Sequence, residues 1–217
     1  MEAANIGARE ADVMPAQEDP TRGSAGWTPA DPGPLGLAAF AGTTFVLSMI
    51  NTNLVGAGAL PVVFGLALAY GGIAQFVAGL WEFRTGNTFG AVAFCSYGAF
   101  WISYYFLVHT PIALSAAHSA VGLYLWMWGI FTTYMFVASL RTTAAVSLVF
   151  LLLAITFIIL GIGNSALAGT HSVTNGTVKL GGWFGLATAI CAWYASFAVV
   201  LNSTFNRVVL PVFPLRG

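Results

Sequence analysis

Charged side chains are scarce in this sequence of 217 residues, at 6% of the total, whereas soluble domains carry about 25%. The few charges are also segregated, because eight of the fourteen (seven basic and seven acidic) precede residue 32. Between residues 32 and 206 the charged residues are only Glu82, Arg84, Arg141 and Lys179. Such a stretch cannot present a water-soluble surface, so an ordinary soluble protein is excluded.

Cysteines and basic clusters are also few. Cys95 and Cys191 both lie inside apolar runs, which favours small core residues over a disulfide framework. The formal net charge is zero and no basic patch exists, so nucleic acid is not expected as a partner. No basic segment leads into the first apolar run near residue 35, so no signal peptide is expected.

The N-terminal segment differs from the rest of the chain. Residues 1–31 hold six acidic residues, two arginines and three prolines, with no apolar periodicity. They cannot bury enough surface to offset chain entropy, so the sequence predicts a disordered polar tail. A transmembrane domain is expected over 32–206, followed by a short cytoplasmic tail at 207–217.

Continuous apolar runs follow the tail, and each is close to the ~20 residues that a helix needs to cross a bilayer. The runs do not alternate with polar residues, which favours helices over barrel strands. The sequence therefore predicts an all-α membrane protein with six transmembrane helices. They are expected at about 35–50, 59–81, 88–108, 119–139, 143–163 and 181–201.

The distribution of basic residues predicts the orientation. Six spans put both termini on one side, and that side would carry all six arginines, against Lys179 alone on the other. Cytoplasmic loops carry the excess of Lys and Arg, so the prediction is N-in and C-in.

Residues that could support an enzyme or a metal centre are sparse. The three histidines, His109, His118 and His171, fit solvated loop residues better than a metal site, because no ligand motif surrounds them. No nucleophile motif or phosphate-binding loop occurs, so no enzyme and no cofactor are predicted. Aromatic residues near span ends, including Trp101, are typical of interfacial anchors.

Polar side chains inside the spans are the remaining candidates. Gln75, Glu82, Asn87, Thr88 and Asn164 lie within or at the ends of spans, where polar groups usually face another helix or a wet cavity. Any one of them could serve interhelical hydrogen bonding, but the set suggests a solute path. Glu82 is expected at the inner interface, either tuning proton or anion access or pairing with Arg84 as an anchor. These residues alone predict a small six-helix channel or transporter.

Ordered sequence blocks give a more specific prediction. The segment Asp31, Pro32, Gly33, Pro34, Leu35, Gly36 and Leu37 resembles the N-P-A-P-L-G-L signature of the acetate uptake transporter family, the succinate–acetate permeases. Matching blocks follow in order at 70–75, 78–82, 86–90, 96–98 and 100–101, and later at 124, 128–132, 163–164, 182–183 and 200–202. The resemblance covers residues 31–211 and all six spans.

This resemblance implies a function and a set of residues. It implies a hexamer of six-helix protomers, each with its own path for acetate and related short carboxylates, and a constriction formed by Phe40, Tyr97 and Leu153. The sequence departs from the signature at Asp31 and Gly33, where the family has Asn and Ala. An aspartate at this place can still cap the helix, because its carboxylate accepts from free N–H groups.

We therefore predict a multi-pass protein of the inner or plasma membrane that passes acetate and related carboxylates, including succinate, with or without proton coupling. Its expected partners are the carboxylate, the lipid bilayer and further copies of the chain. The alternatives are a channel for another small neutral solute such as ammonia, or a non-transporting membrane sensor. A sensor would usually carry a folded soluble domain, and the short polar tail is no such domain.

Overall fold

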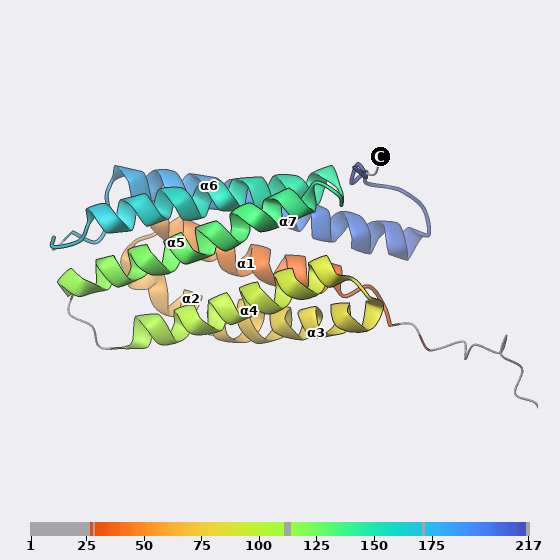
Figure 1. Ribbon diagram of the computed structural model, residues 1–217, viewed down its shortest axis with the longest axis horizontal. Helices are drawn as coiled ribbons and strands as arrows, with labels where there is room; N and C mark the ends of the chain where they lie inside the picture. The colour runs from red at the N-terminus through yellow and green to blue at the C-terminus, as the bar shows by residue number, and fades with distance from the viewer. Residues whose placement is uncertain (1–26, 28, 111–113, 171, 216–217) are drawn as a thin grey trace, which may run out of the picture.

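The computed structural model describes residue 27 and residues 29–110, 114–170 and 172–215. Its long elements are all helical, which confirms the all-α fold (Figure 1). The helical elements are α1 (Gly33–Asn51), η1 (Ala57–Ala59), α2 (Leu60–Leu68), η2 (Ala69–Ala74), α3 (Gln75–Thr85), α4 (Thr88–His109), α5 (Leu114–Ser139), α6 (Ala144–Ala166) and α7 (Gly176–Phe205).

Six helical stretches in the described residues are long and apolar enough to cross a membrane, as expected. The last of them, α7, has 30 residues and is longer than the run predicted over 181–201. Hydropathy underestimates the length of this helix, because Lys179 and Asn202 are polar although they lie within it. The side chain of Asn175 accepts from the backbone N–H of Val178 and thereby fixes the start of the helix.

The second span is a single helical run with a change of winding. Between α2 and α3 the segment η2 is a π-helix that contains Gly71 and Gly72, both buried. A π-helical turn inserts extra backbone into an α-helix and often accompanies a functional site. Composition predicted a continuous helix here and gave no sign of this interruption.

The chain crosses the bundle six times, so that both ends of the described chain lie at the same end of the molecule (Figure 1). This end, which also holds the α3–α4 and α5–α6 turns, is called the terminal end below. The opposite end, where Asn53, Thr110 and Thr174 lie, is called the distal end. Helix α1 packs on α7, α6 packs on both α5 and α7, and α3 packs on α4.

A C-terminal segment covers part of the terminal end. The side chain of Asn202 accepts from the N–H groups of Val209 and Leu210, at 2.6 and 3.0 Å, and turns the chain back after α7. The backbone N–H of Ala144 then donates to the carbonyl of Phe213 at 2.8 Å. This contact satisfies a free N–H group at the start of α6, as every helix start requires.

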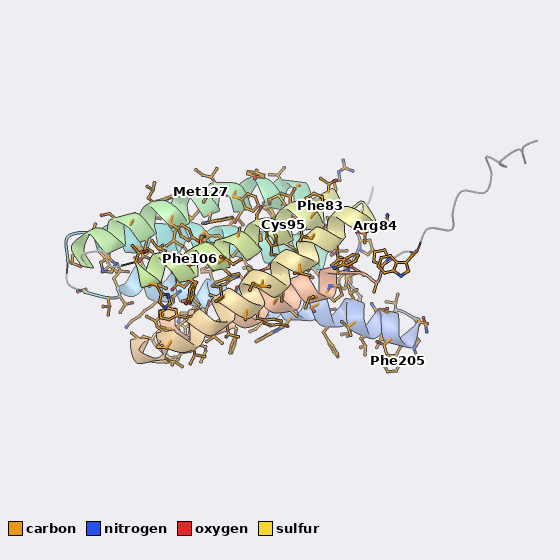
Figure 2. All side chains as sticks on the ribbon, turned by 90° about the horizontal axis from the view of Figure 1, so that it is seen from below. Phe83, Arg84, Cys95, Phe106, Met127 and Phe205 are labelled. Atoms are coloured by element: carbon orange, nitrogen blue, oxygen red, sulfur yellow. The ribbon has the colours of Figure 1, made fainter. Side chains whose placement is uncertain are left out.

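The outer surface of the bundle is apolar. Figure 2 shows Phe83, Phe106, Met127 and Phe205 extending away from the helices, and about half or more of each side chain is exposed. Large exposed apolar side chains in such number are unfavourable in water but suit a lipid environment. The polar groups that position a site must therefore lie inside the bundle or at its two ends.

Candidate functional site

A cavity of about 440 Å³ lies inside the bundle between α1, α4, α5 and α6. It extends to the distal end, where the start of α7 and the polar side chains of Asn53, Thr110 and Thr174 contribute to its wall. Its volume is at the lower end of the range for small-molecule sites, which is roughly 300–1,000 Å³. The lining is largely aromatic and aliphatic, and it contains no Asp, Glu, Lys or Arg among the described residues.

Toward the terminal end, the cavity stops at about the same depth on three helices. Phe40 on α1 and Leu153 on α6 are the lining residues nearest the terminal end on their helices, and Phe100 has the same place on α4. Tyr97 lies one turn before Phe100 and does not line the cavity. Its ring packs against the ring of Phe40, with 5.7 Å between the ring centroids.

Phe40, Tyr97 and Leu153, predicted together from the family resemblance, thus lie in one buried cluster at the closed end of the cavity. The hydroxyl group of Tyr97 is 2.9 Å from the hydroxyl of Thr132, which in turn donates to the carbonyl of Trp128. These two contacts fix the orientation of the tyrosine ring. The three side chains therefore pack together at the side of the cavity that faces the terminal end.

Three polar atoms on the cavity wall have no hydrogen-bond partner in the described structure. They are Oγ1 of Thr44, Nε1 of Trp101 and Nε2 of His118. Because an unpartnered buried donor or acceptor costs free energy, such atoms are suited to meet a polar solute or water. Tyr124, by contrast, donates to the carbonyl of Phe100 at 2.6 Å.

Two of these residues correct expectations drawn from the sequence. His118 is not a solvated loop residue, because its side chain is 8% exposed and lines the cavity. Trp101 is not an interfacial anchor, because it lies in the middle of the bundle and is 2% exposed. His109 is exposed as expected, and His171 lies outside the described residues. The position of His118 directly before a long apolar run, rather than within a polar loop, is the signal that could identify it.

Of the five polar residues predicted along the path, Asn164 lines the cavity and the other four do not. Its amide group donates to the carbonyl of Leu160 at 2.9 Å. Gln75 is buried on α3 and its Oε1 has no partner, whereas Thr88 is exposed at the first position of α4.

Glu82 and Asn87 form a hydrogen-bonded cluster at the terminal end. The amide of Asn87 donates to Oε2 of Glu82 at 2.9 Å, and the hydroxyl of Thr85 donates to the same oxygen at 3.2 Å. Asn87 also caps α4, because its Oδ1 accepts from the N–H of Gly90 at 3.1 Å. A Cβ atom at position 90 would lie 2.7 Å from the carboxyl carbon of Glu82, so the cluster requires glycine there.

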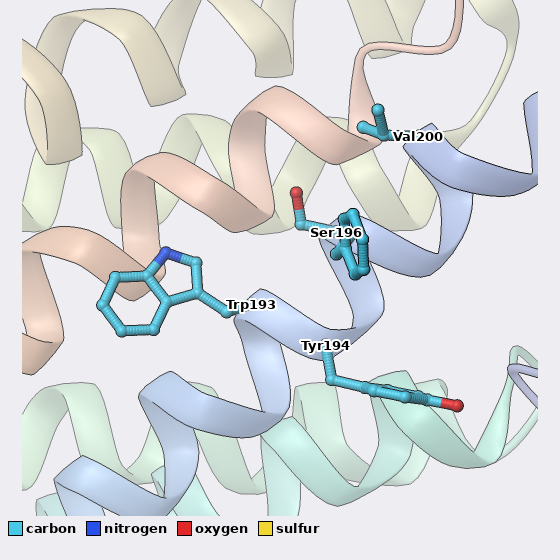
Figure 3. Close-up of a pocket in the computed structure, with 5 residues that line it drawn as sticks. Trp193, Tyr194, Ser196 and Val200 are labelled. Carbon is cyan, nitrogen blue, oxygen red and sulfur yellow. The ribbon is translucent and has the colours of Figure 1, made fainter. Parts of the chain in front are cut away.

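The helix-start signature packs α1 against its neighbours. Asp31 Oδ1 accepts from the N–H of Gly33 at 2.8 Å, so the aspartate satisfies a free N–H group at the start of the helix. A Cβ at Gly36 would lie 2.6 Å from the ring of Phe94, which shows how closely α1 and α4 approach each other. Figure 3 shows Ser196 on α7 pointing toward α1, where its hydroxyl donates to the carbonyl of Pro34 at 2.7 Å.

Residues 22–217 match the sequence profile of the GPR1/FUN34/yaaH family, and this match covers most of the chain. The chain belongs to the GPR1/FUN34/yaaH family. Acetate permease A of Emericella nidulans is 42% identical over 84% of this chain, which spans 65% of the length of that relative. The succinate-acetate/proton symporter SatP of Escherichia coli is 40% identical over 84% of this chain and 95% of its own length.

A solved structure of this family agrees with the fold. The structure of the bacterial acetate channel SatP matches with a TM-score of 0.76 and 35% sequence identity. The match covers 85% of this chain and 99% of that channel. The family resemblance that the ordered blocks indicated is therefore confirmed, and the chain has the architecture of a multi-pass membrane protein.

Proposed function

We propose that this protein is a membrane channel or transporter for acetate and related short carboxylates, with succinate among them. The observation that carries the proposal is a cavity of about 440 Å³ with an apolar wall and few unpartnered hydrogen-bonding groups. Such a wall packs the methyl group of acetate, while Thr44, Trp101 and Asn164 offer polar contacts to its carboxylate. The names of the two relatives and of the matching structure agree with this substrate class.

In this proposal Phe40, Tyr97 and Leu153 form the constriction. Two aromatic rings and a leucine side chain offer little to a bare anion, because removing its hydration shell is costly. The constriction would therefore select slim solutes and favour those that carry a proton through it. A hydrophobic constriction can also close by excluding water.

Beyond the constriction, we propose that the path continues to the terminal end past Gln75, Glu82, Asn87 and Thr88. Glu82 is the carboxylate nearest to such a path within the described bundle, and its 2% exposure shows that it does not face bulk solvent. Proton or anion access at this mouth would then depend on Glu82. Its hydrogen bonds from Asn87 and Thr85 also support the simpler role of joining α3 to α4.

We further propose that the terminal end faces the cytoplasm and that the protomers form a hexamer in the inner or plasma membrane. The excess of arginine at the terminal end supports the orientation. A shallow apolar groove on α7, lined by Trp193, Tyr194, Phe197 and Val200 among others, supports contact with another copy (Figure 3). Native mass spectrometry of the detergent-solubilised protein would test the hexamer.

Uptake of labelled acetate into liposomes that contain the purified protein would test the proposed function. Acetate flux well above that of protein-free liposomes is expected, together with competition by unlabelled succinate. Flux of ammonia, followed by the internal pH of the same liposomes, addresses the alternative of a channel for a small neutral solute. Ammonia flux without acetate flux would overturn the proposal, and the absence of both would favour a sensor.

A further inference from the structure

His118 stands apart from the other polar groups of the cavity because it can carry a positive charge. It lies on α5 near the distal end of the cavity, is 8% exposed, and its Nε2 has no hydrogen-bond partner among the described residues. A buried nitrogen of this kind is unfavourable unless a solute or a water molecule meets it. Its place on the cavity wall makes a solute in transit a suitable partner.

The surroundings of His118 contain no fixed charge that would compete for it. Among the described lining residues, the other ionisable side chains are Tyr104 on α4 and Tyr124 on α5, phenols that ordinarily ionise only near pH 10. The lining residues of α1, η1, α6 and α7 are apolar or uncharged polar residues. Lys179 on α7 and His109 on α4 belong to the same end of the bundle, but neither lines the cavity.

The side chain of His109 is engaged elsewhere. Its Nδ1 lies 2.7 Å from the carbonyl of Tyr105, and its ring packs against Phe64 and Tyr105. Of the described residues on the cavity wall, His118 is therefore the one whose side chain can carry a positive charge.

We infer that His118 is a carboxylate-binding residue at the distal end of the cavity, and that it captures the anion when its imidazole is protonated. This inference rests on the proposed function, because it assigns a ligand group to the same path. A protonated Nε2–H donates a charge-assisted hydrogen bond, and such bonds are stronger than those between neutral groups. Transfer of the imidazole proton to water in the cavity removes this attraction, so an anion held there is released toward the constriction or back to the distal end.

The experiment must separate the protonation of the protein from that of the substrate. Methanesulfonate suits this purpose, because it resembles acetate in size and stays an anion throughout the accessible pH range. Its inhibition of labelled acetate uptake would be measured in liposomes at about pH 5.5 and about pH 7.5, on either side of the ordinary imidazole range. For the unmodified protein we expect inhibition at least about tenfold tighter at the lower pH, which corresponds to about 1.4 kcal/mol.

Four variants, two at His118 and two at the other histidines, assign the effect to His118. His118→Gln keeps hydrogen-bonding groups without the charge, so inhibition should be weak at both pH values. His118→Arg carries a permanent charge, so inhibition should be tight at both. His109→Gln is the matched control outside the cavity and should retain the pH dependence, and His171→Gln covers the remaining histidine of the chain.

Each outcome bears on the inference. A flat wild-type profile overturns it without any variant, and so does pH-dependent inhibition that survives in His118→Gln or disappears in His171→Gln. Size-exclusion profiles in detergent identify a variant that does not fold, and His118→Asn then replaces His118→Gln. If the unmodified protein carries no acetate at all, the proposed function fails. If acetate uptake is normal and the pH dependence is absent, only the role of His118 fails.

Discussion

Shortening Leu153 tests directly where the path is narrowest. Its side chain is 3% exposed and forms part of the closed end of the cavity together with Phe40. Leu153→Ala removes the branched end of the side chain and leaves space on the cavity side of the constriction. Polar contacts to the solute lie on other residues, so the change should affect selection by size more than it affects binding.

The expected magnitude follows from two opposing effects. Truncation of a buried leucine to alanine costs about 2–5 kcal/mol of stability. Leu153 borders an existing cavity, so it loses contacts on one side only, and the cost should lie near 2–3 kcal/mol. In a hydrophobic site, one methylene of steric mismatch is worth about 1–3 kcal/mol, so uptake of lactate or succinate relative to acetate should rise by about tenfold or more.

Labelled acetate, lactate and succinate would be compared in liposomes with equal amounts of folded protein. The matched control is Leu151→Ala, because Leu151 is on the same helix but is 38% exposed and does not line the cavity. The control should keep the wild-type ratio of substrates. A well-folded Leu153→Ala protein with the wild-type ratio would show that Leu153 only packs the core and that the constriction lies elsewhere.

Further substitutions address the terminal end, the helix packing and the cavity wall. Glu82→Gln retains the size of the side chain and removes its charge. Expression should be normal, while the pH profile of acetate uptake should change. An unchanged profile would leave Glu82 only the structural role of joining α3 to α4. Gly36→Ala forces a methyl group toward Phe94, and a thermal melt in detergent should show a loss of about 1–3 kcal/mol. Thr44→Val removes an unpartnered hydroxyl group, so apparent acetate affinity should fall by about tenfold without loss of stability. Thr133→Val, on the outer surface of α5, is the control and should leave acetate affinity unchanged.

The number of spans and their places were predictable because hydropathy alone determines which segments enter a membrane. A local signal also identified the start of the first helix. Asp31 accepts a backbone N–H at the start of α1, as its place before two prolines predicted. Gln75 and Glu82 share the buried face of α3, which follows from their separation of seven residues.

The features that were missed depend on three-dimensional packing. The π-helical segment arises where Gly71 and Gly72 meet α1 and α4, and glycine content does not reveal that contact. His118 and Trp101 were placed at surfaces because both occur near apparent ends of apolar runs, where polar and aromatic residues are common. Only the arrangement of the helices shows that both side chains face inward.

Glu82 at the terminal end differs from Thr44 and His118 on the cavity wall in whether the protein itself satisfies its polar atoms. At the terminal end, the carboxylate of Glu82 accepts from Asn87 and Thr85, and this cluster is complete enough to hold α3 and α4 in place. On the cavity wall, Thr44 and His118 each present an atom that has no hydrogen-bond partner within the part of the chain that the structure describes. Unmet polar atoms lower stability, so atoms of this kind on the wall of a cavity are suited to contacts with a solute, in line with the proposed function. On this argument, a substitution that removes the hydrogen bonds of this cluster, unlike the size-matched Glu82→Gln, should mainly destabilise the protein, whereas removal of a cavity-wall group should mainly weaken substrate binding.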